Sequence, residues 1–261
     1  MTHPLLKLLP QAIRSSVYHR IFIRKEERNF ELFRNATLDY CSAVKMDLFP
    51  SDVSHRHIAY TGFYELPLTR KITRLAKEGG LMVDVGANFG YFSLLWAGTS
   101  ASNKVIAIEA SPRVFPYYQE NIKKNALGSQ VEMHNLAAGA EPGRLSFSLG
   151  PAEQTGWGGF GSADIGGEVV EVKVVKLDEL IPPDVEISVL KIDVEGADTL
   201  VLKGARRLLE QKRIHHIFFE ENDRRMQLLG IDRADAVNFL HSVGYSLESF
   251  GQPGEYHAFP K

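Results

Sequence analysis

The sequence predicts an α/β fold with a doubly wound, mostly parallel sheet of seven strands. Apolar runs rich in β-branched residues alternate with helical patterns over most of the chain. These runs lie at residues 81–85, 104–109, 130–135, 187–193 and 214–220. Strands buried on both faces read as continuous apolar runs, and their alternation with helices implies parallel pairing through right-handed crossovers.

Residues 1–57 precede the sheet and are expected to form an N-terminal helical cap or extension, ahead of a main domain at 58–261. The first 25 residues hold no acid and are able to form an amphipathic helix broken at Pro10. A transit peptide or a membrane-surface helix is therefore an alternative to a cap packed on the main domain. No apolar run approaches the roughly 18 residues needed to span a bilayer, and the segment lacks the apolar core of a secretory signal.

A glycine-rich turn follows the first predicted strand, where residues 83–90 read Val-Asp-Val-Gly-Ala-Asn-Phe-Gly. Glycine permits positive φ and lets a ligand approach the backbone, while the following helix offers free N–H groups. Asp84 precedes Gly86, and its carboxylate is able to accept hydrogen bonds from the loop amides or from an ammonium group of a ligand. A tight strand-to-helix turn that binds nothing is the alternative.

Glu109 ends the second predicted strand, 19 residues after Gly90. A carboxylate at this place is suited to accept both hydroxyls of a ribose, which indicates an adenosine-containing cofactor. The loop reads D-x-G-x-N-x-G rather than G-x-G-x-x-G, and its acid would repel a pyrophosphate. The sequence of the loop therefore favours S-adenosylmethionine, which carries an ammonium and a sulfonium, over a nicotinamide dinucleotide.

Residues typical of helix ends, and apolar residues at helical spacing, predict two helices. Ser111 and Pro112 read as an N-cap and a first-turn proline, and Gly128 closes the helix that they open. Apolar residues recur at helical spacing in 197–212 and form a stripe that faces the sheet. Gly204 lies inside this second helix, where glycine costs about 1 kcal/mol relative to alanine, so it indicates close packing.

An insertion is predicted between the third and fourth strands. Its flanks, 143–149 and 168–177, alternate polar and apolar residues, which is typical of half-exposed strands. Seven glycines lie between Gly150 and Gly167, so we expect a hairpin-like β insertion with a mobile loop. Trp157 on this loop is a candidate substrate lid, and an incidental tryptophan on a disordered insertion is the alternative.

The C-terminal end predicts a hairpin rather than a further parallel unit. Residues 245–250 and 255–260 read as strands, and Gly-Gln-Pro-Gly between them is a turn signal. We therefore expect the last strand to be antiparallel.

The composition is that of a globular protein without a strong electrostatic field. Thirty Lys and Arg against 32 Asp and Glu leave a formal charge of −2, which argues weakly against a nucleic-acid partner. The single cysteine, Cys41, rules out an intrachain disulfide framework and fits a reducing compartment. A cytoplasmic location is the resulting expectation.

Three stretches together resemble one known family: VDVGANFGYFSLLWA, VIAIEASPRVFPYYQENIKKNAL and LKIDVEGADTLVLKGA. They look like the FkbM-type S-adenosylmethionine-dependent methyltransferases, and the resemblance covers about residues 58–250. It implies a class I methyltransferase with a Rossmann-like sheet that often O-methylates a hydroxyl of a natural product or sugar. A nicotinamide-dependent oxidoreductase, a methyltransferase acting on RNA or protein and a noncatalytic interaction module are the alternatives.

The resemblance places Asp193 near the methionine part of the cofactor and the substrate. Asp193 or Glu195 is expected to be the base or to orient the acceptor, without a single assignment. For Glu195, an acid that satisfies a helix dipole is the alternative. Trp157 is the substrate-contacting candidate. The expected cofactor-binding residues are Tyr64, Glu65, Asp84, Gly86, Ala87, Asn88, Gly90, Glu109, Ala110, Ser111, Ala137 and Asp193.

A divalent metal is considered but not favoured, because the family pattern does not require one. Glu220, Glu221 and Asn222 are able to join Asp193 in an oxygen-rich site suited to Mg²⁺. His55 and His57 precede the sheet and are expected over the cleft. His215 and His216 lie on opposite faces of a strand, so at most one of them reaches the site, and a core or surface histidine is the alternative. The acceptor is expected to be a small molecule or glycan. The sequence is compatible with either a monomer or a homodimer.

Overall fold

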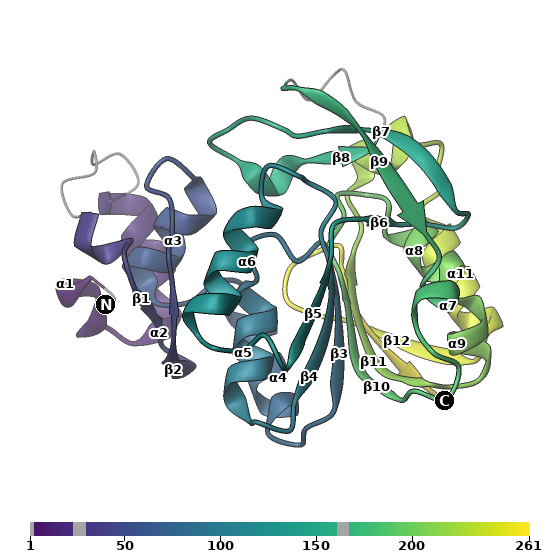
Figure 1. The fold of residues 1–261 in the computed structure, drawn as a ribbon, viewed down its shortest axis with the longest axis horizontal. Coiled ribbons are helices and arrows are strands. Elements are labelled where there is room, and N and C mark those ends of the chain that lie inside the picture. The colour runs from purple at the N-terminus through teal and green to yellow at the C-terminus, as the bar shows by residue number, and fades with distance from the viewer. Residues whose placement is uncertain (1–2, 23–29, 161–166) are drawn as a thin grey trace.

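The computed structural model describes residues 3–22, 30–160 and 167–261 and confirms the α/β class (Figure 1). The central sheet is built from β3 (Leu81–Val85), β4 (Lys104–Ile108), β5 (Val131–His134), β10 (Ile187–Ile192), β11 (Ile214–Glu220), β12 (Tyr245–Ser249) and β13 (Glu255–Pro260). Its seven strands lie in the order β12-β13-β11-β10-β3-β4-β5. β13 is antiparallel to both neighbours and every other pair is parallel, so the predicted C-terminal hairpin is confirmed.

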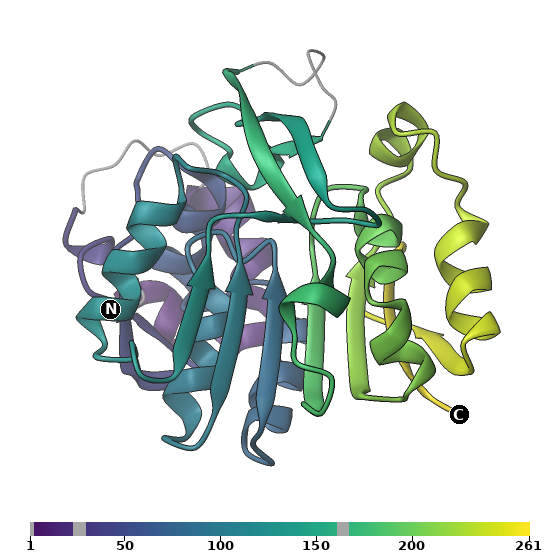
Figure 2. The same ribbon diagram turned by 45° about the vertical axis from the view of Figure 1, so that its right-hand side comes forward.

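Helices cover both faces of this sheet (Figures 1 and 2). One layer contains α4 (Leu66–Ala76), α5 (Tyr91–Thr99) and α6 (Phe115–Lys124). The other contains α7 (Leu177–Leu180), α8 (Asp198–Gly204), α9 (Arg206–Glu210) and α11 (Ala234–Ser242), and α10 (Asp223–Leu228) precedes α11. Met82 and Val83 are adjacent in β3 and both fully buried, yet they belong to different core clusters. The continuous apolar runs of the strands follow from this two-sided burial.

Two helix boundaries differ from the prediction. α6 begins at Phe115, after a turn at residues 112–114. Ser111 Oγ accepts from Val114 N at 3.4 Å, which is the contact expected of an N-cap residue, so the cap is present but the regular helix starts later. The same helix ends at Lys124, and Ala126 rather than Gly128 takes the left-handed conformation.

The predicted helix at 197–212 is divided at Ala205 into α8 and α9. Asp178 causes the second start, because its carboxylate accepts from Arg207 N at 2.8 Å and Leu208 N at 3.1 Å.

Gly204 is packed as closely as predicted, since a Cβ there would lie 2.1 Å from the Gly139 oxygen. We expect Gly204→Ala to lower the free energy of unfolding by about 2 kcal/mol, because backbone atoms must move to admit the methyl group. Urea denaturation followed by circular dichroism measures the change. Gly128→Ala is the matched control, because no atom lies within 4 Å of its added Cβ. Equal losses in both variants would refute the packing argument.

The insertion forms a second, four-stranded sheet over the carboxyl ends of the central strands (Figure 2). It consists of β6 (Ala137–Ala138), β7 (Gly143–Ser148), β8 (Gly159–Phe160) and β9 (Val169–Val175). β7 and β9 pair antiparallel, as predicted, and a short 3-10 helix at Thr155–Trp157 lies between β7 and β8. Part of the loop predicted to be mobile, 161–166, lies outside the described residues.

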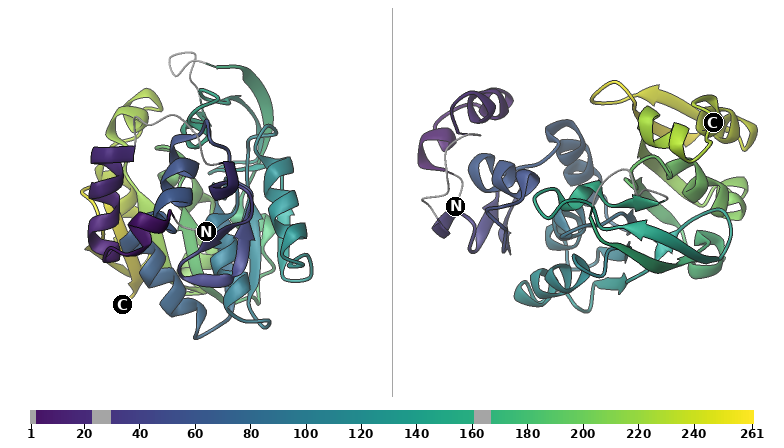
Figure 3. Two further views of the ribbon diagram at one scale, coloured as in Figure 1. Left: turned by 90° about the vertical axis from the view of Figure 1, so that its left-hand side faces the viewer. Right: turned by 90° about the horizontal axis from the view of Figure 1, so that it is seen from above.

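The N-terminal extension packs at one end of the molecule, beside α5 and α6 (Figure 3). It contains α1 (Pro4–Lys7), α2 (Gln11–Val17), a π-helical turn (Tyr18–Phe22), a 3-10 turn (Phe30–Leu32), β1 (Ala36–Leu38), β2 (Cys41–Met46) and α3 (Val53–Thr61). Leu6, Tyr18 and Phe33 are buried in one core cluster with Trp96 of α5. The boundary expected after residue 57 falls inside α3. No helix in the described part of the chain is long and apolar enough to cross a membrane.

Candidate active site

The glycine loop joins β3 to α5 and is fixed by its neighbours on both sides. Gly86 N and Ala87 N donate to the Ile108 oxygen of β4 at 2.9 and 3.1 Å. Gly86 has φ +75°, and a Cβ there would lie 1.9 Å from the Asp193 oxygen. The position therefore requires glycine both for its conformation and for the close approach of the β10 strand end.

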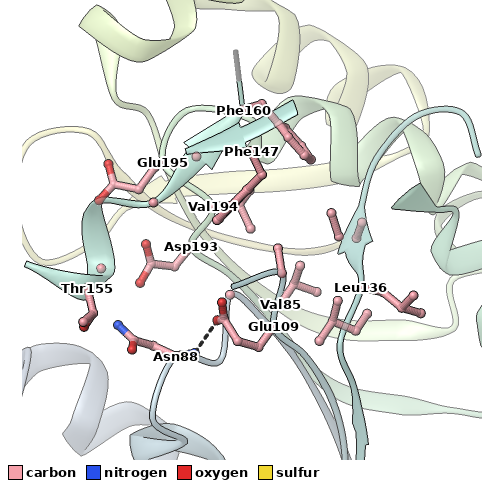
Figure 4. A pocket seen from close by; sticks show the side chains of 18 residues that line it. Val85, Asn88, Glu109, Leu136, Phe147, Thr155, Phe160, Asp193, Val194 and Glu195 are labelled. Carbon is pink, nitrogen blue, oxygen red and sulfur yellow. Dashed lines mark hydrogen bonds between the residues drawn. The ribbon is translucent and has the colours of Figure 1, made fainter. Parts of the chain in front are cut away.

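Glu109 follows β4 and binds the loop through its carboxylate (Figure 4). One oxygen accepts from Asn88 N at 2.7 Å and the other from Ser111 N at 2.8 Å. Burial raises the pKa of this carboxyl to about 7, although both hydrogen bonds act in the opposite direction. The side chain is held in one orientation at the edge of a pocket.

This first pocket lies between the glycine loop and the insertion (Figure 4). Its apolar side is formed by Ile108, Leu136, Ala137, Phe147 and Phe160, and its polar side includes Asn88, Glu109 and Asp193. The buried Oδ1 atom of Asn88 has no hydrogen-bond partner among the described residues. A ligand with an apolar flat part and polar groups fits this lining.

A second cavity of 310 Å³ adjoins the first pocket and shares Gly86, Asn88, Asp193 and Glu195 with it. The N-terminal extension forms its far side through Met46, Val53, Ser54, His55 and Ile58. Tyr64, Glu65, Trp157, Lys191 and Glu220 also line it. The two spaces therefore meet at the carboxyl ends of β3 and β10.

Asp193 lies at this junction and lines both spaces as well as a smaller third pocket next to Glu220. Asp193 N donates to the Val85 oxygen at 3.0 Å, which holds the end of β10 against β3. Glu195 has φ +55° and is followed by Gly196 at +89°, so the chain turns here and Glu195 also reaches the cavity. Asn222 Nδ2 donates to Glu195 Oε2 at 3.1 Å.

Lys191 is a buried cation that the sequence reasoning missed. Its Nζ lies 3.1 Å from Asp193 Oδ2, 3.8 Å from Asp84 Oδ1 and 3.4 Å from the Gly86 oxygen. Burial opposes its charge, but Asp193, Asp84 and Glu65 together raise its pKa above the ordinary value, so it is an ammonium at neutral pH. The signal in the sequence is a lone lysine in the apolar run ISVLKI.

Four carboxylates line the cavity, and the pKa values of the three glutamates among them are raised. The charge of Asp193, together with burial, raises the pKa of Glu220 to about 9. Burial and the same charge raise the pKa of Glu65 to about 8 and that of Glu195 to about 7. In the unliganded protein, these glutamates are therefore partly or mostly protonated at neutral pH.

These raised pKa values predict that the unliganded protein loses stability as the pH rises. Glu65, Glu195 and Glu220 bind protons more tightly in the folded protein than in the unfolded chain, so the free energy of unfolding falls between the ordinary glutamate pKa and the folded values of about 7 to 9. We expect a fall of about 2 kcal/mol from pH 6.5 to 8.5 in urea denaturation. Glu220→Gln should reduce this fall, and a stability that rises over the interval would contradict the repulsion.

Residues 149–160, which we call the strap, line both spaces and are held by hydrogen bonds from several parts of the fold. Arg113 donates to the carbonyls of Leu149, Gly150 and Pro151. Asp52 Oδ2 accepts from Thr155 N at 3.0 Å and Thr155 Oγ1 at 2.8 Å. Arg225 donates to the Trp157 oxygen at 2.9 Å. The Trp157 side chain is half exposed and lines the 310 Å³ cavity.

Most of the expected site residues line these spaces: Tyr64, Glu65, Gly86, Ala87, Asn88, Glu109, Ala110, Ala137, Trp157, Asp193 and Glu195. Three others do not line the two spaces. Asp84 is buried and accepts from Ser93 Oγ at 2.6 Å, and it faces Lys191 rather than the loop amides. Gly90 packs against the Tyr118 ring, where a Cβ would lie 2.1 Å from it. Ser111 supports Glu109 through its amide.

The histidines and the residues of the possible metal site lie in different parts of the fold. His55 lines the cavity, whereas His57 contacts Ser15 Oγ, His215 contacts Glu186 and His216 contacts His257. Asn222 caps α10 and Glu221 accepts from Tyr256. Within 3–22, 30–160 and 167–261, no group of three or more His, Cys, Asp or Glu side chains is arranged to hold a metal ion.

Comparison with known proteins gives three relevant similarities. "Methyltransferase 1" of Beauveria bassiana is 25% identical over 148 residues, which are 49% of this chain and 59% of that protein. "Hexuronic acid methyltransferase AglP" of Haloferax volcanii is 25% identical over 187 residues, 70% of this chain and 71% of that protein. The crystal structure of Methyltransferase FkbM from Methylobacillus flagellatus KT superposes with a TM-score of 0.49 at 21% identity, covering 70% of this chain and 44% of that one.

The chain thus spans less than two thirds of the Beauveria protein and less than half of the Methylobacillus chain. The family profile described as "Methyltransferase FkbM domain" matches residues 84–247. That match covers more than half of the chain and contains the glycine loop, Glu109, Lys191, Asp193 and the insertion. The chain belongs to the FkbM methyltransferase family.

Proposed function

We propose that this protein is an S-adenosylmethionine-dependent methyltransferase that O-methylates a hydroxyl of a small molecule, natural product or sugar. The observation that carries the proposal is the meeting of the glycine loop, Glu109 and Asp193 at one edge of the sheet, between two adjoining spaces. Membership of the FkbM family supports methyl transfer. The name of the Haloferax relative supports a sugar as acceptor.

The first pocket fits the nucleoside part of this cofactor. We assign the ribose hydroxyls to Glu109, whose carboxylate is held at the pocket edge by two backbone amides. The apolar side around Leu136 and Ala137 suits the adenine, and the unpartnered Asn88 Oδ1 offers a further acceptor. Tyr64, Glu65 and Asp193 are assigned to the methionine part, where negative charge complements an ammonium and a sulfonium.

Asp193 is assigned as the base or orienter of the acceptor hydroxyl. When bound, the cofactor supplies an electrophilic methyl group on its sulfonium. The protein has to hold the acceptor oxygen in line and accept its proton, and both tasks fall to groups at the junction of the two spaces. Lys191 holds Asp193 Oδ2 at 3.1 Å and so fixes the orientation of this carboxylate. Glu195, with a pKa raised to about 7, is the alternative base.

Isothermal titration calorimetry tests the cofactor assignment. The protein is expected to bind S-adenosylhomocysteine and not NAD⁺. Glu109→Ala should weaken S-adenosylhomocysteine binding at least tenfold, because the ribose loses its acceptor and the loop amides lose theirs. Asp84→Ala should weaken it as well, since Lys191 loses a partner beside the glycine loop.

Glu132→Ala is the matched control, because this carboxylate is exposed on β5 and contacts only His134 among the described residues. Preferential binding of NAD⁺ would favour the oxidoreductase. Unchanged affinity in both Glu109→Ala and Asp84→Ala would show that the pocket is misplaced.

A further inference from the structure

We propose that the 310 Å³ cavity is the acceptor site and that its acceptor carries a protonated amine close to the methylated hydroxyl, as in an amino sugar or an aminocyclitol. This inference rests on the proposed methyl transfer and names its substrate class. It differs from the hexuronic acid in the name of the Haloferax relative, because a uronate brings a carboxylate.

The position of the cavity makes it the space that an acceptor must occupy. It touches the proposed cofactor pocket at Gly86, Asn88 and Asp193, so a molecule inside it lies beside the proposed base. Its far side comes from the N-terminal extension, which contributes Val53 and Ile58. The volume is at the lower end of the range for small-molecule sites, about 300–1,000 Å³. With the methionine part of the cofactor assigned to the side of the cavity at Tyr64 and Glu65, a single six-membered ring suits the space that is left.

The charge lining the cavity selects the sign of the acceptor. Glu65, Asp193, Glu195 and Glu220 face two cations. Lys191 is already bound between Asp193 and Asp84, and Arg225 lies 3.8 Å from Glu195. In the described part of the chain, no hydrogen bond reaches the Glu220 carboxylate. An acceptor carboxylate would add repulsion to this set, whereas an ammonium lowers it and lets the acids ionise. S-adenosylmethionine carries two positive groups and one carboxylate, so its net charge of about +1 does not neutralise the excess of carboxylates in the cavity.

His55 supplies an independent polar contact for a ligand. The residue is buried, with 3% exposed, and it lines the cavity. The Phe49 N–H donates to His55 Nδ1 at 2.9 Å, which assigns the ring proton to Nε2. Burial lowers its pKa to about 4, so the ring is neutral. No hydrogen bond to Nε2 is found among the described residues, and this N–H is a donor for an acceptor hydroxyl.

Aromatic side chains complete the lining. Tyr64, Phe89, Tyr91, Phe92 and Trp157 all contribute to the cavity wall. Aromatic faces pack against the C–H face of a sugar ring and attract ammonium groups through their negative π faces. The combination of aromatic walls and carboxylates fits an amine-bearing ring better than an acyl chain.

An organic cation fits the carboxylates better than a metal ion does. The acids line a wide cavity, and within the described residues no group of three is close enough to coordinate a metal. An ammonium on a ring contacts spaced carboxylates one at a time, whereas Mg²⁺ needs octahedral oxygen ligands at about 2.1 Å.

Saturation-transfer NMR on the protein saturated with S-adenosylhomocysteine tests the inference with three probes of one ring shape: D-glucosamine, D-glucose and D-glucuronate. We expect glucosamine to bind at least tenfold more tightly than glucose, and glucuronate to give no transfer. Glu220→Gln should reduce the preference for glucosamine over glucose at least threefold. Glu195→Gln provides the same test if the first variant fails to fold.

The control variant is Glu210→Gln, which removes an exposed carboxylate on α9 and should leave the preference unchanged. Tighter or equal binding of glucuronate overturns the inference, as does absence of binding by all three sugars. A requirement for Mg²⁺, shown by loss of glucosamine binding with EDTA, also overturns it. Failure to bind S-adenosylhomocysteine itself would overturn the proposed function instead, so the two failures are distinguishable.

Discussion

Asp193→Asn is expected to lower kcat for methyl transfer by about 10²- to 10⁴-fold, the range for loss of a general base. Asparagine keeps the size of the side chain but accepts no proton. Lys191 keeps Asp84 and the Gly86 oxygen as partners, so the substitution should not unfold the site. S-adenosylhomocysteine affinity should therefore stay within about tenfold, a range set by one lost charge contact. Single-turnover kinetics with labelled cofactor measures the chemical step separately from binding.

Glu195→Gln is the comparison that assigns the base. Glu195 lines the same cavity but already accepts from Asn222 and faces Arg225 at 3.8 Å. These partners indicate a structural role, so we expect its kcat to fall by less than about tenfold. A larger loss in Glu195→Gln than in Asp193→Asn would reverse the assignment.

Gly86→Ala is expected to abolish cofactor binding and to lower the free energy of unfolding by about 3 kcal/mol or more. The left-handed backbone costs about 1 kcal/mol for alanine. The added methyl group would also lie 1.9 Å from the Asp193 oxygen and 2.9 Å from its carbonyl carbon. Because this obstacle is backbone, the glycine loop and the end of β10 must separate. Urea denaturation and calorimetry with S-adenosylhomocysteine measure the two effects.

Gly230→Ala isolates the conformational part of this effect. Gly230 also has positive φ, +67°, but no atom lies within 4 Å of its added Cβ. We expect a loss of about 1 kcal/mol with unchanged cofactor affinity. If Gly86→Ala lowered the free energy of unfolding by no more than Gly230→Ala, the close approach of the glycine loop to the end of β10 would not contribute to stability.

The sequence predicts the sheet well because its strands are buried on both faces. Adjacent residues such as Met82 and Val83 enter different core clusters, which leaves an unbroken apolar run as the signal. Helix starts are less predictable, because they depend on distant partners. The division at Ala205 follows from Asp178, which lies 29 residues before Arg207 and caps the second helix.

The central part of the candidate site was also predictable, because parallel strands bring Gly86, Glu109 and Asp193 to one edge. The periphery was not. The contact of Asp52 with Thr155 joins residues 103 positions apart, and no local pattern marks it. Of the wall contributed by the N-terminal extension, His55 was expected over the cleft, but Met46, Val53, Ser54 and Ile58 were missed, since no motif indicates what these residues pack against.

The hydrogen bonds that hold the strap have a consequence for ligand exchange. Asp52 holds it from the extension, while Arg225 holds it from α10, which lies next to the proposed catalytic carboxylates. In the proposed enzyme, we expect these hydrogen bonds to order the strap over the bound ligands, so that Asp52→Ala speeds the dissociation of S-adenosylhomocysteine, as measured by stopped-flow displacement.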